Sequence, residues 1–309
     1  MNHELKNVSQ KYLIIVAGPT AAGKTDVAIR LANHYNTSII SADSRQIFKE
    51  LNIGVARPSL AELQRAPHYF IANKSIHDYY SAGEYEREVI LLLDDLFQKN
   101  DVVILCGGTG FYINAILNGF DEIPKVAEHI RIELNNKFQK TGIEPLKMLL
   151  KELDEISYQK IDLQNTQRVI RALEVCIGTG QPFSTFKKEQ KPIRNFTPIK
   201  IGINLPQNQL HANINLRVDK MMTQGLLEEA KAVYPYRQHN ALQTVGYKEL
   251  FDFLEHKTTL PEAVEWIKIH TRQYAKRQLT FFNKNDDYLW FEPKFFDFMI
   301  KYIENERDV

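Results

Sequence analysis

A short segment near the start of the chain constrains the fold more than any other feature. Its residues match the phosphate-loop pattern G-x-x-x-x-G-K-[ST] in full: Gly18-Pro19-Thr20-Ala21-Ala22-Gly23-Lys24-Thr25. An apolar run of strand length, 12–17, precedes the loop, and 26–32 follows with apolar residues at helical spacing. A strand, a glycine-rich loop and a helix in this order predict a parallel α/β sheet with an anion site at the helix N-terminus.

The residue types of this loop suit phosphate chemistry. Glycines let backbone N–H groups face an anion. Lys24 would reach the terminal phosphate, and the Thr25 hydroxyl would ligate a magnesium ion. Mg²⁺ is therefore the expected cofactor. The alternative is a glycine-rich turn that binds no ligand.

Composition and length set broad limits on the class of protein. The chain has 309 residues, of which 44% are hydrophobic, enough for one large or two modest domains. It contains neither an apolar stretch of membrane-helix length nor an N-terminal signal-peptide pattern. Its two cysteines, Cys106 and Cys176, lack metal-ligand spacing. We expect a cytoplasmic protein with no membrane contact and no obligatory protein partner.

Strands and helices alternate through the first part of the chain. Further strands are predicted at 37–43, 101–106 and 199–205, with helices at 83–100 and from 110 through 117. From 207 onward the chain is predicted to be helical and to end with a short strand at 288–291. Ligands in parallel sheets lie at the carboxyl ends of the strands. Gly18, Asp43 and Gly107 all follow predicted strands.

The middle of the chain has a different character. Residues 125–179 show helical periodicity without a strand signal, broken near Thr141-Gly142 and around Leu163. We therefore expect a P-loop NTPase-like parallel-sheet core, formed by 1–119 and 198–309, with an inserted helical domain at 120–197. The stretch 160–200 contains eight basic and three acidic residues. Such a stretch is either a footprint for a polyanion or a solvated helix face.

A second signature of nucleotide hydrolases is missing. The strand 101–106 runs into Cys106-Gly107-Gly108-Thr109 and does not end in the carboxylate that holds magnesium in P-loop ATPases and GTPases. A carboxylate follows the other strand instead, at Asp43, where it could accept a proton from a substrate nucleophile. The alternative is an aspartate that only caps or stabilises its loop.

The chain resembles the tRNA dimethylallyltransferases, also called tRNA isopentenyltransferases, along nearly its whole length. The resemblance begins with the phosphate loop and Asp43-Ser44-Arg45-Gln46. It continues through later motifs: Pro67-His68, Gly107-Gly108-Thr109-Gly110-Phe111-Tyr112, Arg168-Val169-Ile170-Arg171-Ala172-Leu173-Glu174-Val175, Gly246-Tyr247-Lys248-Glu249 and Thr271-Arg272-Gln273-Tyr274-Ala275-Lys276-Arg277-Gln278. These later motifs are more specific than the loop alone.

This resemblance implies a reaction and its partners. The dimethylallyl group of dimethylallyl diphosphate would pass to the N6 amine of an adenosine in the tRNA anticodon stem-loop. The target would be the adenosine 3′-adjacent to the anticodon in tRNAs that read codons beginning with U, and diphosphate would be released. The phosphate loop would then hold a leaving group, which agrees with the missing second carboxylate. Asp43 would accept the N6 proton.

The resemblance also assigns roles to single residues. Thr20 and Lys24 would contact the diphosphate, Thr25 the magnesium, and Arg217 would neutralise the departing diphosphate. Without the family, Arg217 reads as a surface arginine on an amphipathic helix. The positions that match tRNA-contacting residues are Asp43, Ser44, Arg45, Gln46, Thr109, Arg131, Gln167, Arg168, Val169, Ile170 and Arg171.

Two arginines of the insertion admit a second interpretation. Arg168 and Arg171, three residues apart, lie on one helix face and suit two neighbouring phosphates, or else form salt bridges with residues such as Glu174. The sequence departs from the family after Gln278, where Phe281-Phe282-Asn283 stands in place of a tryptophan followed by a basic residue. Three rival functions are prenylation of free adenine nucleotides, a small-molecule kinase, and a non-enzymatic RNA-binding module.

Overall fold

The chain divides into two compact units. Unit 1 comprises Met1–Asn118 and Ile193–Val309, and unit 2 comprises Gly119–Pro192. The computed structural model describes residues 10–121, 123–187, 192–284 and 287–308. The ranges expected from the sequence were 1–119 with 198–309, and 120–197. In the structure the second half of unit 1 begins at Ile193, and its first strand begins at Thr197.

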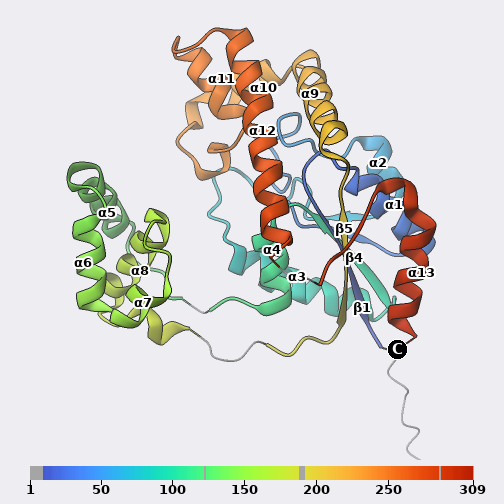
Figure 1. Ribbon diagram of the computed structural model, residues 1–309, viewed down its shortest axis with the longest axis horizontal. Helices are drawn as coiled ribbons and strands as arrows, with labels where there is room; N and C mark the ends of the chain where they lie inside the picture. The colour runs from blue at the N-terminus through green and yellow to red at the C-terminus, as the bar shows by residue number, and fades with distance from the viewer. Residues whose placement is uncertain (1–9, 122, 188–191, 285–286, 309) are drawn as a thin grey trace, which may run out of the picture. The chain divides into compact units, whose positions relative to one another are not determined.

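Unit 1 is built on a six-stranded parallel sheet (Figure 1). The strands lie in the order β3-β2-β4-β1-β5-β6. Their bounds are β1 Tyr12–Ala17, β2 Ile39–Ser41, β3 His68–Tyr69, β4 Val102–Gly107, β5 Thr197–Ile203 and β6 Leu289–Phe291. The five predicted strands are confirmed, with ends that differ by a few residues. The two-residue β3 was not predicted, because so short a strand carries no periodicity.

The central strand β1 divides the core of unit 1 into two layers. Leu13, Ile15 and Ala17 belong to one apolar cluster, and Tyr12, Ile14 and Val16 belong to the other. Successive side chains of a strand point to opposite faces. Both faces of this sheet are covered, so every residue of β1 is buried. A continuous apolar run of this kind is typical of parallel sheets.

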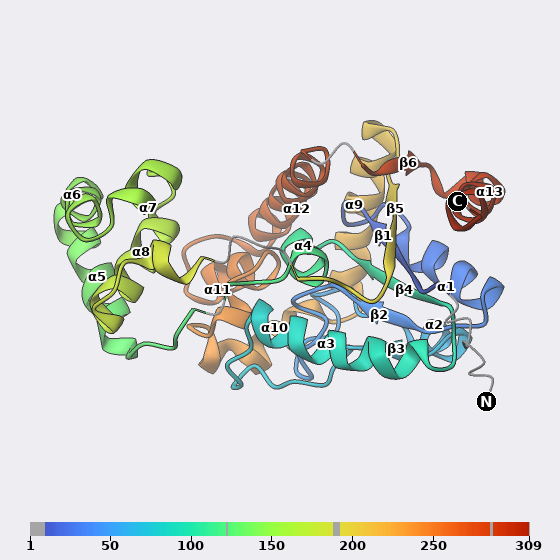
Figure 2. The ribbon, with the colours of Figure 1, turned by 90° about the horizontal axis from the view of Figure 1, so that it is seen from below.

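Helices cover each face of the sheet (Figure 2). Buried residues of α1 Lys24–His34 and α13 Phe296–Arg307 belong to one cluster, and those of α3 Ala82–Phe97 and α4 Gly110–Asn118 to the other. The helices predicted at 26–32, 83–100 and 110–117 are confirmed. The prediction that the chain ends with a strand is wrong, because α13 follows β6. Its apolar residues Phe296, Met299 and Ile303 recur at helical spacing and pack on the sheet.

The second half of unit 1 supplies the helices that surround the carboxyl edge of the sheet. They are α9 Gln207–Thr223, α10 Leu226–Val233, α11 Tyr247–Leu254 and α12 Leu260–Phe282. The long helix α12 begins at a capping box, in which Thr259 and Glu262 satisfy each other's backbone N–H groups. Helix α12 packs against α9, α11 and α4. A shorter helix in the first half, α2 Leu60–Arg65, also begins at a capping box and was not predicted.

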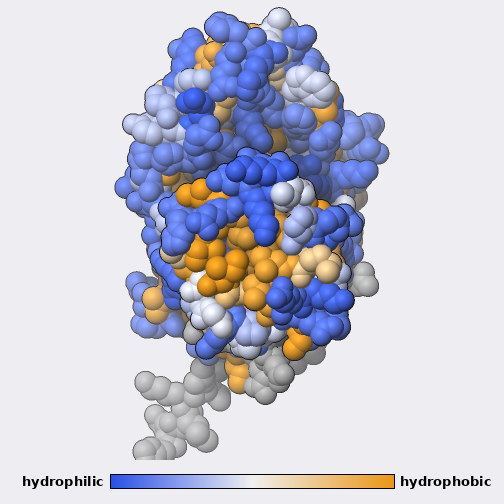
Figure 3. All heavy atoms as spheres, turned by 90° about the vertical axis from the view of Figure 1, so that its left-hand side faces the viewer, coloured by the Kyte–Doolittle hydropathy of each residue, from blue (hydrophilic) through white to orange (hydrophobic). Residues whose placement is uncertain are grey.

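Unit 2 is helical, as the sequence predicted, and has a core of its own. Its helices are α5 Glu128–Thr141, α6 Glu144–Leu153, α7 Glu155–Lys160 and α8 Thr166–Thr179. Leu134, Leu146, Leu150 and Leu173 are among the buried residues that join α5, α6 and α8. Hydrophobic residues, orange in Figure 3, gather on the face of this unit that is turned to the viewer. The large apolar side chains that unit 2 exposes are Ile132, Met148, Leu153, Ile156 and Ile177.

Candidate active site

The phosphate loop connects β1 to α1 at the carboxyl edge of the sheet. Two glycines determine its path. A Cβ atom at Gly18 would lie 2.2 Å from the carbonyl oxygen of Ile203, so only glycine allows the loop to approach β5 this closely. Gly23, with a φ of 93°, is the left-handed residue immediately before α1. The loop thus presents backbone N–H groups at a helix N-terminus, where the helix dipole favours an anion.

Lys24 and Arg217 bring positive charge to the loop from two different elements. The Lys24 Nζ donates a hydrogen bond of 2.7 Å to the carbonyl oxygen of Pro19. Arg217 lies on α9, and its Nη1 donates a bond of 3.1 Å to the Thr20 hydroxyl. The surface-arginine alternative for Arg217 is therefore wrong, since this guanidinium is directed to the loop.

The environment of these two cations alters their protonation. Burial lowers the pKa of Lys24 to about 8, and the nearby Arg217 charge also lowers it, whereas Cys106 and Asp43 act in the opposite direction. Burial likewise lowers the pKa of Arg217, against the pull of Glu62 and Asp43. Lys24, Arg217 and Asp43 therefore share one electrostatic environment. An anion bound there would favour the protonated form of Lys24.

The loop after β2 holds Asp43 in a defined turn. Its Oδ1 accepts hydrogen bonds from the backbone N–H groups of Arg45 at 2.9 Å and Gln46 at 3.3 Å. The loop-stabilising interpretation of Asp43 is therefore observed for one oxygen of the carboxylate. Within the described part of the chain, no backbone N–H donates to Oδ2.

The neighbours of Asp43 join this turn to other elements. The Thr109 hydroxyl accepts a bond of 3.0 Å from the Ser44 N–H. Arg45 Nη1 donates to the carbonyl oxygen of Asn240 at 3.0 Å, and Gln46 Nε2 donates to that of Ala56 at 2.9 Å. The structure thus brings the predicted residues 43–46 and Thr109 together. It also shows that Arg45 and Gln46 already bind protein carbonyl groups.

The end of β4 confirms that no carboxylate faces the phosphate loop from this strand. Cys106 occupies the place, and its Sγ donates a hydrogen bond of 3.8 Å to the carbonyl oxygen of Lys24. Burial raises the pKa of the Cys106 thiol to about 11, so the group is neutral at pH 7. The structure therefore places an uncharged side chain where P-loop ATPases and GTPases carry an acid.

The side chains near the loop fit a magnesium ion that is bound mainly through phosphate. The described residues contain no group of three or more His, Cys, Asp or Glu side chains that could hold a metal ion by themselves. Mg²⁺ usually keeps several waters and uses one or two protein ligands together with substrate phosphates. Thr25, the second residue of α1, offers one such oxygen.

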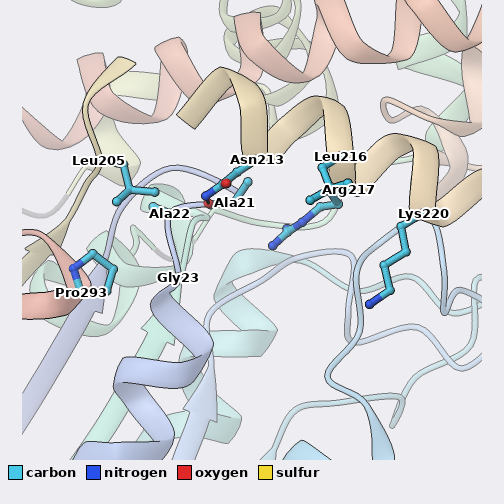
Figure 4. Close-up of a pocket in the computed structure, with 9 residues that line it drawn as sticks. All are labelled: Ala21, Ala22, Gly23, Leu205, Asn213, Leu216, Arg217, Lys220 and Pro293. Atoms are coloured by element: carbon cyan, nitrogen blue, oxygen red, sulfur yellow. Dashed lines mark hydrogen bonds between the residues drawn. The ribbon is translucent and has the colours of Figure 1, made fainter. Parts of the chain in front are cut away.

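A cavity of about 520 Å³ lies beside the phosphate loop (Figure 4). Its walls come from the loop, from α9, from the segment after β5, and from the short helix η4 Pro293–Phe295. Arg217 and Lys220 provide two positive charges, whereas Leu205, Leu216 and Pro293 provide apolar surface. This combination suits a molecule that has both an anionic and an apolar part.

The arginines of unit 2 form a polar face around one buried acid. Glu174 is 5% exposed, and its Oε2 lies 3.1 Å from Nη1 of Arg171 and 3.5 Å from Nη1 of Arg131. Arg131 also donates from Nη2 to Gln167 at 3.3 Å. The salt-bridge interpretation is thus observed for Arg171, whereas Arg168 is exposed at the start of the same helix.

Two residues of the predicted RNA-contacting segment do not reach the surface. Val169 and Ile170 are fully buried in the core of unit 2. Helical periodicity explains this difference. With 3.6 residues per turn, Val169 and Ile170 fall on the buried face of α8, whereas Gln167 and Arg168 fall on its exposed face. Any side-chain contact from this segment would come from Gln167, Arg168 and Arg171. Of the basic stretch, Lys188 and Lys191 and the acid Glu189 lie outside the described residues.

Comparison with known proteins identifies the family. Residues 46–285 match the family described as IPP transferase. The chain belongs to this family. It is 50% identical over 288 residues to tRNA dimethylallyltransferase of Flavobacterium johnsoniae, covering 91% of this chain and 93% of the relative. It is 48% identical over 283 residues to the same enzyme of Cytophaga hutchinsonii, covering 92% and 93%.

Solved structures agree with this assignment. The full-length tRNA isopentenylpyrophosphate transferase of Bacillus halodurans matches with a TM-score of 0.70 and 31% identity, over 97% of this chain and 98% of that chain. A eukaryotic dimethylallyltransferase acting on tRNA matches with a TM-score of 0.74 and 27% identity, over 88% of this chain and 69% of that chain. Among the described residues, none of the helices combines the length and the apolar character that a membrane span requires.

Three side chains at the site, Gln278, Tyr274 and Lys220, were not predicted from the sequence. Gln278 bonds to the Thr20 N–H and to the Gly108 carbonyl group. Tyr274 lies beside Thr109 and Asp43, and Lys220 lines the cavity with Arg217. Helical spacing was the available signal, because Tyr274 and Gln278 are four residues apart in a quoted motif and Lys220 follows Arg217 by three.

Proposed function

We propose that this enzyme transfers the dimethylallyl group of dimethylallyl diphosphate to the N6 amine of an adenosine in the anticodon stem-loop of tRNA. One observation carries the proposal: Lys24 and Arg217 both bond to the phosphate loop, at Pro19 and Thr20, and Asp43 lies close enough to both cations to influence their pKa values. Two cations and a carboxylate base close together suit a reaction that releases diphosphate and a proton. Membership in a family of named tRNA dimethylallyltransferases supports the same substrates.

Different residues act on the diphosphate leaving group and on the N6 nucleophile. The bond between the allylic carbon and the diphosphate oxygen breaks as the bond from N6 to that carbon forms. Lys24, Arg217 and the loop N–H groups stabilise the negative charge that develops on diphosphate. Asp43 takes the N6 proton through Oδ2, since its Oδ1 is held by the turn. A magnesium ion held through Thr25 would neutralise further charge on the diphosphate.

The phosphate loop and its surroundings support diphosphate over ATP. Cys106 is neutral at the position where an acid would complete the metal site of a P-loop ATPase or GTPase. The cavity beside the loop adds apolar residues to its two cations, which favours a diphosphate with a short hydrocarbon group. The face of unit 2 around Arg168 and Arg171 supports a macromolecular acceptor over a free nucleotide. The tRNA acceptor is consistent with the cytoplasmic location expected from the sequence.

Mass spectrometry of tRNA tests this proposal. The pure protein is incubated with unmodified tRNA, dimethylallyl diphosphate and magnesium, and the tRNA is then digested to nucleosides. We expect one adenosine of the anticodon loop to gain the mass of a dimethylallyl group. Modification of free adenosine monophosphate alone would identify the nucleotide prenyltransferase instead. ATP consumption with unmodified tRNA would identify a kinase.

A further inference from the structure

One face of helix α12 exposes aromatic side chains along its length. Trp266 is 50% exposed, Tyr274 37% and Phe281 38%. They are separated by eight and seven residues, which brings them to the same side of an α-helix. Scattered exposed aromatics are ordinary on a protein surface, but these three lie in a row on one helix. We call Trp266, Tyr274 and Phe281 the aromatic strip.

Neighbouring polar groups hold the strip in place. The Trp266 ring stacks on His270, with centroids 5.5 Å apart and an interplanar angle of 27°. Nδ1 of His270 lies 2.5 Å from the buried carboxylate of Glu249. The guanidinium of Arg277 lies over the Tyr274 ring at 5.9 Å. Trp266 and Tyr274 therefore each have a neighbouring side chain against the ring, and all three rings of the strip stay partly exposed to solvent.

The strip passes directly beside the candidate active site. The phenol of Tyr274 shares a hydrogen bond with Thr109 and lies near the Asp43 carboxylate, while the side chain as a whole stays 37% exposed. Phe281 packs against the start of α4, where a Cβ atom at Gly110 would lie 2.2 Å from its ring. Trp266 lies about 12 Å along the helix axis from Tyr274, at 1.5 Å per residue. The strip thus passes the site at Tyr274 and extends along α12 to Trp266.

We infer that the aromatic strip is a stacking surface for the unpaired bases that flank the target adenosine in the RNA loop. This inference rests on the proposed function. Aromatic side chains bind unpaired bases by stacking and need no particular base, because every base has a π-face. Charge complementarity favours RNA as the occupant. Lys276 and Arg277 are exposed on the same helix.

Intrinsic fluorescence tests the inference, since the chain contains only two tryptophans, Trp266 and Trp290. In Trp290→Phe, Trp266 is the only emitter, and stacking of a base on it should quench the emission. The probe is an RNA hairpin with the anticodon-loop sequence, and its binding is followed independently by the anisotropy of a terminal dye. We expect saturable quenching with the same midpoint as the anisotropy change. In the matched variant Trp266→Phe, the emission of Trp290 should stay constant.

A second test of the inference measures the affinity of variants for the RNA hairpin. Trp266→Ala should weaken hairpin binding by about 5- to 150-fold, the loss that corresponds to one stacked base. Trp266→Phe keeps an aromatic ring and should lose less. Phe298→Ala, which removes an aromatic side chain that is 62% exposed on α13, should leave the affinity unchanged. The affinity of Trp266→Ala for inorganic diphosphate should equal that of the wild type, which shows that the fold is intact.

The outcomes separate the two proposals. Hairpin binding with constant Trp266 emission, and with equal affinity for Trp266→Ala, would refute the stacking surface while the transferase activity stands. Failure of the hairpin to bind at all, together with unmodified tRNA in the mass-spectrometric assay, would refute both. Equal quenching by a fully paired RNA duplex would also overturn the inference, because a duplex offers no unpaired base.

Discussion

The backbone N–H of Thr20 donates a hydrogen bond of 2.9 Å to Oε1 of Gln278. The same side chain donates from Nε2 to the carbonyl oxygen of Gly108 at 2.8 Å. Gln278 is 6% exposed, so one buried carboxamide connects the phosphate loop to the loop after β4. These two loops carry the groups proposed for the diphosphate and for the RNA. Their spacing therefore depends on a residue of α12.

Replacing Gln278 should destabilise the fold measurably. Gln278→Met keeps the length of the side chain but leaves the Thr20 N–H and the Gly108 carbonyl group without their partner. We expect the free energy of unfolding to fall by about 1–3 kcal/mol, as for a buried polar group that loses its hydrogen bond. Urea unfolding measures this change. Gln273→Met, at an exposed position of the same helix, should change it by less than about 0.5 kcal/mol. Equal effects of the two substitutions would contradict the bridging role.

Removing the charge of Lys24 should affect chemistry more than RNA binding. We expect Lys24→Ala to lower turnover by about 10²–10³, the scale of losing one group that stabilises developing charge. The RNA is expected to be held mainly by other surfaces, so its affinity should fall much less. Steady-state kinetics and filter binding measure the two quantities. Comparable losses in both would mean that the loop does not hold the leaving group.

The lowered pKa of Lys24 predicts a pH dependence of anion binding. Only protonated Lys24 attracts diphosphate, and in the free protein its pKa is about 8. The affinity for inorganic diphosphate should therefore decrease as the pH rises through about 8. Calorimetry on wild type and Lys24→Arg separates this effect from titration of the ligand, because arginine stays charged throughout the range. Parallel pH profiles of the two proteins would rule out Lys24 as the titrating group.

Substitution of Asp43 distinguishes a proton acceptor from a residue that only stabilises its loop. In the Asp43→Asn variant the amide oxygen can still accept from the Arg45 and Gln46 N–H groups, so the turn should persist. The basicity is lost, and we expect turnover to fall by about 10²–10⁴. The melting temperature and the RNA affinity should barely change. Turnover within a few-fold of the wild type would show that Asp43 has only the structural role.

The arginines of unit 2 should contribute unequally to RNA binding. Arg168 is exposed, whereas Arg171 is already paired with Glu174 at 3.1 Å. If each contacts one phosphate, Arg168→Ala should reduce the slope of log affinity against log salt by about 0.7–0.9, and Arg171→Ala by less. The double variant should bind inorganic diphosphate normally. Lys301→Ala on α13 is the control for loss of one positive charge. An unaltered slope in the double variant would leave both arginines with only structural roles.

Local patterns in the sequence were sufficient for most of the core. The strand at 12–17, the phosphate loop and the helix after it are all encoded by neighbouring residues, and the structure contains them. The same holds for the helical character of unit 2 and for the absence of a carboxylate at the end of β4. Periodicity and glycine positions carry this information because they act over a few residues of backbone.

Contacts between distant residues could not be obtained in this way. Arg217 reaches Thr20 across 197 residues and Gln278 reaches it across 258. An apolar pattern shows which face of a helix is buried, but it does not specify which element covers that face. For this reason Arg217 admitted a surface interpretation. The helix α13 and the burial of Val169 and Ile170 follow local helical periodicity instead, and these two differences from the prediction did not require tertiary information. The chain itself determined the chemistry of the phosphate loop, and tertiary packing decided which charges and hydrogen bonds surround it.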